Sequence, residues 1–143
     1  MIINIILLAI LLVSSCYDIK FKEIPVWTIL LAGVVSVIYN AILIYKGHFD
    51  YNDLIVSLFP GALFLTIALI CKGNLGIGDG AMLLAIAPGL GILHIYLGLM
   101  LALLLSSLVA IFLIIFKRAG KKTRMPFIPF LSIGIGGAII VFG

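Results

Sequence analysis

The chain has 143 residues, of which 65% are hydrophobic and only 10% are charged, and its mean hydropathy is +1.44. Soluble domains are about half apolar and a quarter charged, whereas disordered chains are polar and charge-rich. The composition therefore excludes both classes and predicts an integral membrane protein. The net charge of +4 comes mainly from one short basic run, so binding to nucleic acid is not expected.

Apolar runs follow one another along the chain with short interruptions. They cover approximately residues 1–17, 25–45, 54–71, 80–93, 95–116 and 126–142. Backbone polar groups in lipid need partners within the protein, so runs of this length are expected to be helical. We expect an all-α, polytopic transmembrane helical bundle with about six spans, in a single membrane-embedded domain over residues 1–143. Pro60-Gly61 predicts a bend, and Pro88, Gly89 and Gly91 predict the end or a break of the fourth run.

The basic residues gather in alternate loops. If the loops after the first, third and fifth runs face the cytoplasm, every Lys and Arg except Lys46 lies on that side, as the positive-inside rule requires. Both termini are then expected outside a cytoplasmic membrane. The segment 117–124 carries the strongest signal, with Lys117, Arg118, Lys121, Lys122 and Arg124. We interpret it as a topology signal, with contact to anionic lipid headgroups as a second possibility.

The two cysteines, Cys16 and Cys71, form neither a zinc motif nor a disulfide framework that can be read from the sequence. No metal site and no cofactor is expected. Residues 13–16 resemble a lipoprotein processing box, but residues 1–15 contain no Lys or Arg. Since a signal peptide needs a positive amino-terminal region, we expect an uncleaved first span.

Two of the five acidic residues stand apart from the others. Asp50 and Asp53 are expected in a solvated outer loop, and Glu23 precedes the start of the second helix. Asp18 and Asp79 instead lie at membrane boundaries, both on the cytoplasmic side. Acidic groups at membrane depth are costly and usually functional, although each of these two could merely cap or end a helix.

Three glycines surround Asp79, in the order Gly76-Ile77-Gly78-Asp79-Gly80. Glycine permits backbone conformations and close approaches that other residues do not, so Gly76, Gly78 and Gly80 are candidates for a loop that supports the carboxylate. The sequence does not favour a phosphate-binding loop, because no Gly-Lys-Ser/Thr follows and no strand is expected before it.

The helix positions of the two carboxylates suggest different chemical roles. Asp79 opens a helix, where the dipole favours the charged form, whereas Asp18 closes one. If the carboxylates meet, their repulsion makes them share one proton. We therefore expect Asp79 to act as base and Asp18 as acid in the activation of water. Ser14, one turn before Asp18, is a candidate hydrogen-bond partner, although polar residues at helix ends are common.

Three motifs resemble those of the type IV prepilin peptidases, membrane aspartyl proteases with a Gly-x-Gly-Asp signature. Residues 18–25, DIKFKEIP, are similar to the first-aspartate motif of that family. Residues 72–79, KGNLGIGD, are similar to its second, and residues 126–131, PFIPFL, to its Pro-Phe-x-Pro-Phe motif. The resemblance covers nearly the whole chain and implies that Asp18 and Asp79 are catalytic. It implies substrate-binding or structural roles for Lys20, Lys22, Pro25, Lys72, Pro126, Phe127, Pro129 and Phe130.

The resemblance also implies the substrate: a prepilin or prepilin-like protein in the lipid bilayer, cut between a basic leader and an apolar helix. This chain lacks the cysteine-rich zinc region and the methyltransferase portion of larger family members, so no methyltransferase activity is expected. It departs from the family pattern at Val26, Ala81 and Ile128, where Asn, Lys and Gly are common. These departures leave the substrate contacts open.

Three other functions compete with a prepilin peptidase. A small transporter or channel subunit would use Asp18 and Asp79 as a proton or cation site, but such carboxylates usually lie near the membrane midplane. A protease of the presenilin type would carry a Pro-Ala-Leu motif and be far longer. An inactive structural relative would not need both aspartates. The sequence leaves open the pilin system served, the oligomeric state, and whether the two aspartates meet without substrate.

Overall fold

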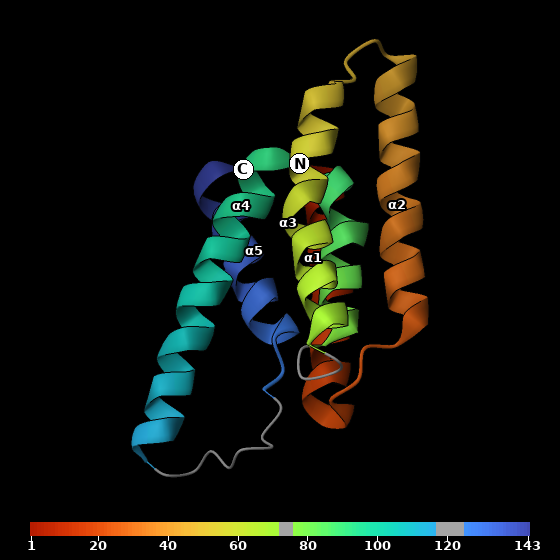
Figure 1. Cartoon of the computed structure of the whole chain (residues 1–143). Helices are drawn as coiled ribbons and strands as arrows, with labels where there is room; N and C mark the ends of the chain where they lie inside the picture. The colour runs from red at the N-terminus through yellow and green to blue at the C-terminus, as the bar shows by residue number, and fades with distance from the viewer. Residues whose placement is uncertain (72–75, 117–124) are drawn as a thin grey trace.

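The computed structural model describes residues 1–71, 76–116 and 125–143. Within these ranges the chain forms helices and no strand, so the expected all-α fold class is confirmed. The helices are α1 (Ile2–Phe21), α2 (Val26–Tyr45), α3 (Tyr51–Ile70), α4 (Ile77–Ile115) and α5 (Ile128–Phe142). They lie side by side in a bundle, with both chain termini toward the same end (Figure 1).

The expected count of about six spans is not established by the helices themselves. Four helices, α1 to α4, are long and apolar enough to cross a membrane. Helix α5 has 15 residues and is shorter than a usual span. Helix α4 has 39 residues, but its first and last residues lie toward the same end of the bundle, because the chain reverses direction within it (Figure 1). The fourth and fifth apolar runs together form this one element.

The reversal in α4 occurs at Gly91, the position with non-helical backbone angles inside that element (φ 75°, ψ 172°). A positive φ favours glycine, since other side chains clash with the backbone there. Pro88, three residues earlier, cannot donate a helical hydrogen bond. The break expected from this proline and the nearby glycines is thus confirmed. Pro60, by contrast, lies inside α3, which continues through it.

Side chains from two other helices satisfy the backbone groups that the break releases. In an unbroken helix the Ile92 N–H would donate to the Pro88 carbonyl. Instead, the Ile92 N–H donates to Asp53 Oδ1 of α3 at 3.1 Å. The Pro88 carbonyl accepts from Asn40 Nδ2 of α2 at 2.9 Å. These two bonds hold α2, α3 and the reversal in α4 together.

Asp50 and Asp53 therefore have different roles, although we expected both in a solvated loop. Asp50 is exposed and caps α3, because its Oδ1 accepts the Asn52 N–H at 2.9 Å. For Asp53 the expectation is wrong: the carboxylate is bonded across helices to Ile92. The reason is that the Ile92 N–H has no acceptor within its own helix and lies beside α3. The sequence alone does not predict that these two segments are neighbours.

Close contacts at glycine hold the helices of the bundle together. A Cβ on Gly61 of α3 would lie 2.8 Å from the Leu84 nitrogen of α4, and a Cβ on Gly134 of α5 would lie 2.9 Å from the Ala102 nitrogen. Small residues allow such backbone approach between helices in membranes. The largest fully buried apolar side chains form the core: Leu7, Leu11, Met82, Leu83, Ile86, Ile95, Ile128, Leu131 and Ile135.

Replacing Asp53 with Ala should destabilise the bundle, because the Ile92 N–H would lose its acceptor. An unpaired backbone group of this kind costs about 1–3 kcal/mol. We expect a lower midpoint in denaturant-induced unfolding in detergent. Asn52→Ala is the matched control, since only the backbone N–H of Asn52 is bonded to Asp50. Equal stability of Asp53→Ala and Asn52→Ala would contradict the prediction.

Candidate active site

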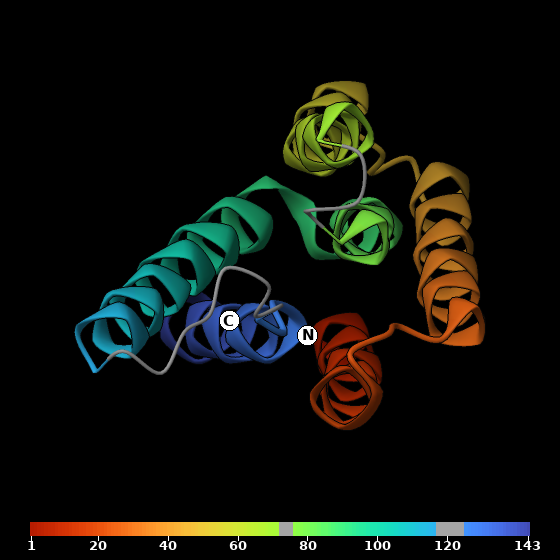
Figure 2. The same cartoon turned by 60° about the horizontal axis from the view of Figure 1, so that its bottom comes forward.

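The two candidate carboxylates lie at the same end of the bundle. Asp18 is in the last turn of α1, where its carbonyl accepts the Lys22 N–H at 2.9 Å. Asp79 is in the first turn of α4. Figure 2 turns this end of the bundle toward the reader, with the end of α1 and the starts of α4 and α5 on the side that comes forward. The helix ends thus bring together three segments that are far apart in the sequence.

The Asp18 carboxylate is buried and bonded to the third motif. Its side chain is 6% exposed, and Oδ2 accepts the Ile128 N–H at 3.3 Å. Ile128 begins α5, and the first N–H groups of a helix have no acceptor within it. The expected partner of Asp18, Ser14, instead donates to the Ile10 carbonyl at 2.9 Å. That local bond replaces the contact we considered, since a serine in a helix reaches the carbonyl four residues back.

The proline and phenylalanine residues of the third motif fix where α5 begins. Pro129 lies in the first turn of α5, where a proline leaves no N–H unpaired and has helical φ already set. The Phe127 ring stacks on Phe64 of α3, with ring centroids 5.4 Å apart. Pro129 and the Phe127–Phe64 stacking thus fix the start of α5 in a position where the Ile128 N–H donates to Asp18. Pro126 and Phe130 are half-buried on either side.

The glycines around Asp79 make close contacts. A Cβ on Gly76 would lie 2.5 Å from Asp79 Oδ2, so the carboxylate folds back over this glycine. A Cβ on Gly78 would lie 3.0 Å from Ile24 Cδ1, in the segment between α1 and α2. The first and second motifs are therefore packed against each other. That these glycines support the carboxylate in a reaction stays a prediction.

The other candidate residues in and beside the second motif are Gly80, Asp79 and Lys72. A Cβ on Gly80 would lie 2.8 Å from the Leu65 nitrogen, so this glycine lets the start of α4 approach α3. Asp79 itself is half-buried. Lys72, which the resemblance implies as a substrate-binding or structural position, lies outside the described residues.

The basic residues of the first motif face outward. Lys20 and Lys22 are exposed, and Lys20 Nζ lies 5.5 Å from the centroid of the Phe21 ring. Lys22 ends α1 with φ 54°, a left-handed conformation more usual for glycine or asparagine. Pro25 is the N-cap of α2 and its carbonyl accepts the Thr28 N–H at 3.1 Å. Pro25 therefore precedes the second helix rather than opening it.

Among the described residues, no group of three or more His, Cys, Asp or Glu side chains is placed to hold a metal ion. Both cysteines are free thiols, with Cys16 exposed and Cys71 half-buried. The candidate functional side chains at this end of the bundle remain the two aspartates.

The sequence pattern of the type IV leader peptidase family matches residues 5–141. That match covers nearly the entire chain and all three motifs. The chain belongs to the type IV leader peptidase family. Its members are membrane proteases that act on prepilin-type substrates, so the resemblance carried by the motifs is confirmed. Searches of curated proteins and of solved structures give no match.

Sequence reasoning missed the contribution of Ile128 to this leader peptidase. We noted it only as a departure from the Gly common in the family, yet it is fully buried and its N–H binds Asp18. Every residue except proline has a backbone N–H, so the residue type at position 128 does not indicate that its N–H binds a carboxylate. A glycine there would carry the same N–H. The only available signal was Pro129, which marks a helix start and hence nearby free N–H groups.

Replacing Gly76 with Ala should reduce leader cleavage, because the new Cβ would displace the Asp79 carboxylate that lies 2.5 Å away. Misplacement of a reacting group by about 1 Å can cost about 100-fold in rate. The measurement is the initial rate of cleavage of a prepilin-like precursor in detergent. Gly33→Ala is the control, since its Cβ would lie 4.0 Å from Ala85 Cβ. Equal losses in the two variants would argue against this placement of Asp79.

Proposed function

We propose that this protein is a membrane aspartyl endopeptidase that removes the leader peptide of type IV prepilin-like precursors at the cytoplasmic membrane face. The observation that carries the proposal is the meeting of three distant motifs at one end of the bundle. There the buried Asp18 carboxylate accepts the Ile128 N–H, and Asp79 lies in the first turn of α4, which starts at the same end of the bundle (Figure 1). Burial of a carboxylate in an apolar protein is costly, which supports a functional role.

In this proposal the two carboxylates activate water without a covalent intermediate. One carboxylate takes a proton from water, whose oxygen attacks the scissile carbonyl carbon. The other carboxylic acid donates a proton toward the carbonyl oxygen, and collapse of the tetrahedral species breaks the C–N bond as the leaving nitrogen is protonated. When the substrate brings the two carboxylates together, two ionised groups would repel, so in this proposal the pair then holds one proton.

The bond from the Ile128 N–H to Asp18 bears on which aspartate is the acid and which the base. Their positions at opposite helix ends alone predict Asp79 as base and Asp18 as acid. Since Asp18 also lies against the start of α5, each carboxylate faces the positive end of a helix dipole. The proposal therefore assigns the shared proton to the Asp18–Asp79 pair and not to either residue alone.

The proposed orientation follows from charge. The segment 117–124 and the lysines beside Asp18 place the catalytic end at the cytoplasmic face, with both termini outside a cytoplasmic membrane. The product is expected to be unmethylated, because the chain carries only Cys16 and Cys71 and not the cysteine-rich region of methylating relatives. The departure at Ile128 leaves the N–H donor to Asp18 in place.

A transporter or channel subunit is less well supported. Such proteins usually hold their carboxylates near the middle of the membrane. Here Asp18 ends α1 and Asp79 begins α4 at one end of the bundle, and the chain belongs to a peptidase family.

Replacing either aspartate with asparagine should abolish cleavage while the protein still inserts in the membrane. Loss of a general acid or base costs about 10²- to 10⁴-fold in rate. The assay is co-expression with prepilin-like precursors, with the pilin amino terminus determined by intact mass. Asp50→Asn is the matched control, because it removes the same charge and asparagine is an equally good helix cap. Retained cleavage by Asp18→Asn or Asp79→Asn would refute the proposal.

A further inference from the structure

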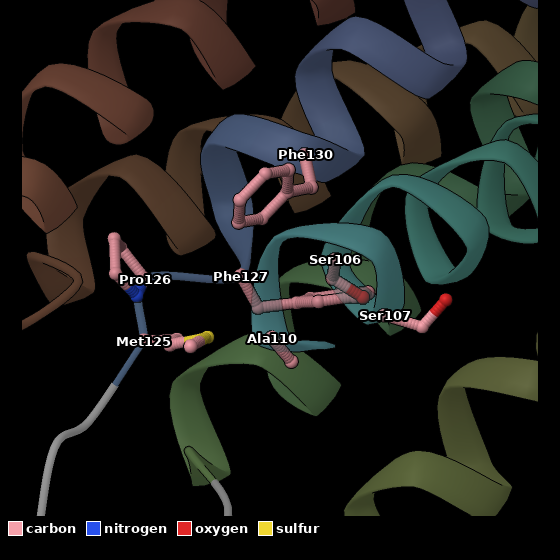
Figure 3. Close-up of a pocket in the computed structure, with 7 residues that line it drawn as sticks. All are labelled: Ser106, Ser107, Ala110, Met125, Pro126, Phe127 and Phe130. Atoms are coloured by element: carbon pink, nitrogen blue, oxygen red, sulfur yellow. The ribbon is translucent and has the colours of Figure 1, made fainter. Parts of the chain in front are cut away.

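A hollow opens between the last part of α4 and the start of α5 (Figure 3). It has a volume of about 260 Å³, enough for side chains of a neighbouring helix but not for a folded domain. Its walls are Ser106, Ser107 and Ala110 on α4, and Pro126, Phe127 and Phe130 at the start of α5. The lining is thus small on one side and aromatic on the other.

The wall formed by small residues of α4 continues a ridge along which α4 packs against another helix. Residues spaced by four along a helix lie on one ridge, and here Gly98 and Ala102 precede Ser106 and Ala110 at that spacing. The first half of the ridge is buried against α5. A Cβ on Gly98 would lie 3.0 Å from the Ile135 Cα. This part is therefore a close helix–helix contact of the kind that small residues permit in membranes.

The second half of the ridge has the same character, but none of the described helices packs against it. Ser106 and Ala110 are only half-buried and line the hollow. The Ser106 hydroxyl donates to the Leu103 carbonyl at 3.0 Å, and the Ser107 hydroxyl donates to the Leu104 carbonyl at 2.8 Å. Because these hydroxyls are satisfied within α4, the surface suits an apolar helix rather than a polar ligand.

The aromatic wall joins the hollow to the candidate active site. Phe127 lines the hollow, and the next residue, Ile128, donates its N–H to Asp18. A helix seated in the hollow would therefore begin beside the end of the bundle that carries Asp18. This position distinguishes the hollow from the other lipid-facing surfaces of α4, such as that around Leu108, which is 61% exposed.

We propose that this hollow receives the apolar, membrane-spanning helix that follows the scissile bond of the substrate. The inference rests on the proposed function, since it takes the substrate to be a prepilin-like precursor. The ridge of Ser106 and Ala110 packs against the substrate helix as Gly98 and Ala102 pack against α5. Phe127 and Phe130 contact its apolar side chains, and the peptide bond before the helix reaches the carboxylates.

Photocrosslinking tests the contact without requiring catalysis. The chain carries Asp18→Asn and Asp79→Asn, so that a co-expressed prepilin-like precursor stays intact, and a benzophenone amino acid replaces either Ala110 or the control Leu108. We expect crosslinks from position 110 to the apolar helix of the precursor, at least tenfold above those from position 108. Equal yields, or crosslinks from position 110 mainly to lipid or to a second copy of this chain, would overturn the inference.

Kinetics separate this inference from the proposed function. In the otherwise unchanged chain, Ala110→Phe fills the hollow and should raise KM for the precursor at least tenfold, whereas Leu108→Phe should not. If the parent chain cleaves the precursor and both variants have the same KM, the docking site is wrong and the proposed function stands. If position 110 crosslinks the helix but the parent chain cleaves no precursor, docking stands and the peptidase proposal fails.

Discussion

A backbone N–H group that has no helical acceptor inside a membrane must find one elsewhere in the protein, because lipid offers none. This constraint is met by a carboxylate at two of the places where a helical segment begins. The Ile92 N–H beyond the break in α4 binds Asp53, and the Ile128 N–H at the start of α5 binds Asp18. Asp53 and Asp18 thus each accept a free donor on another helix, and these two bonds tie the segment after Gly91 and the start of α5 to the bundle.

The two carboxylates differ in what else surrounds them. Asp53 accepts the Ile92 N–H after the break in α4, and Asn40 donates to the Pro88 carbonyl before it. Among the described residues, no second acidic motif lies near this break. Asp18 lies at the end of the bundle where α4 begins with Asp79 and its glycines. The same kind of hydrogen bond therefore stabilises the fold at one place, and at the other it positions a group that the proposed chemistry uses.

Small residues also determine how closely the helices of this protein pack. Helices in a membrane gain little from burying apolar side chains, so close packing depends on residues that let backbones approach. Gly61 and Gly134 provide such contacts between α3 and α4 and between α4 and α5. The ridge on α4 then extends past the start of α5, at Ser106 and Ala110. This open part of the ridge is the surface that we propose for the helix of the substrate.

Composition and local patterns by themselves determined the membrane class, the helical fold and an end or break among Pro88, Gly89 and Gly91, because these depend on hydropathy and on backbone preferences of proline and glycine. The motifs also singled out Asp18 and Asp79 and gave the family. The tertiary structure alone decided that Asp53 caps a broken helix, that Ser14 bonds within α1, and that Ile128 supplies a donor to Asp18. It also showed that the chain reverses direction between the fourth and fifth apolar runs, at Gly91 within α4 (Figure 1). Such features depend on which helices pack together, and a backbone N–H has no signature in the identity of the residue that carries it.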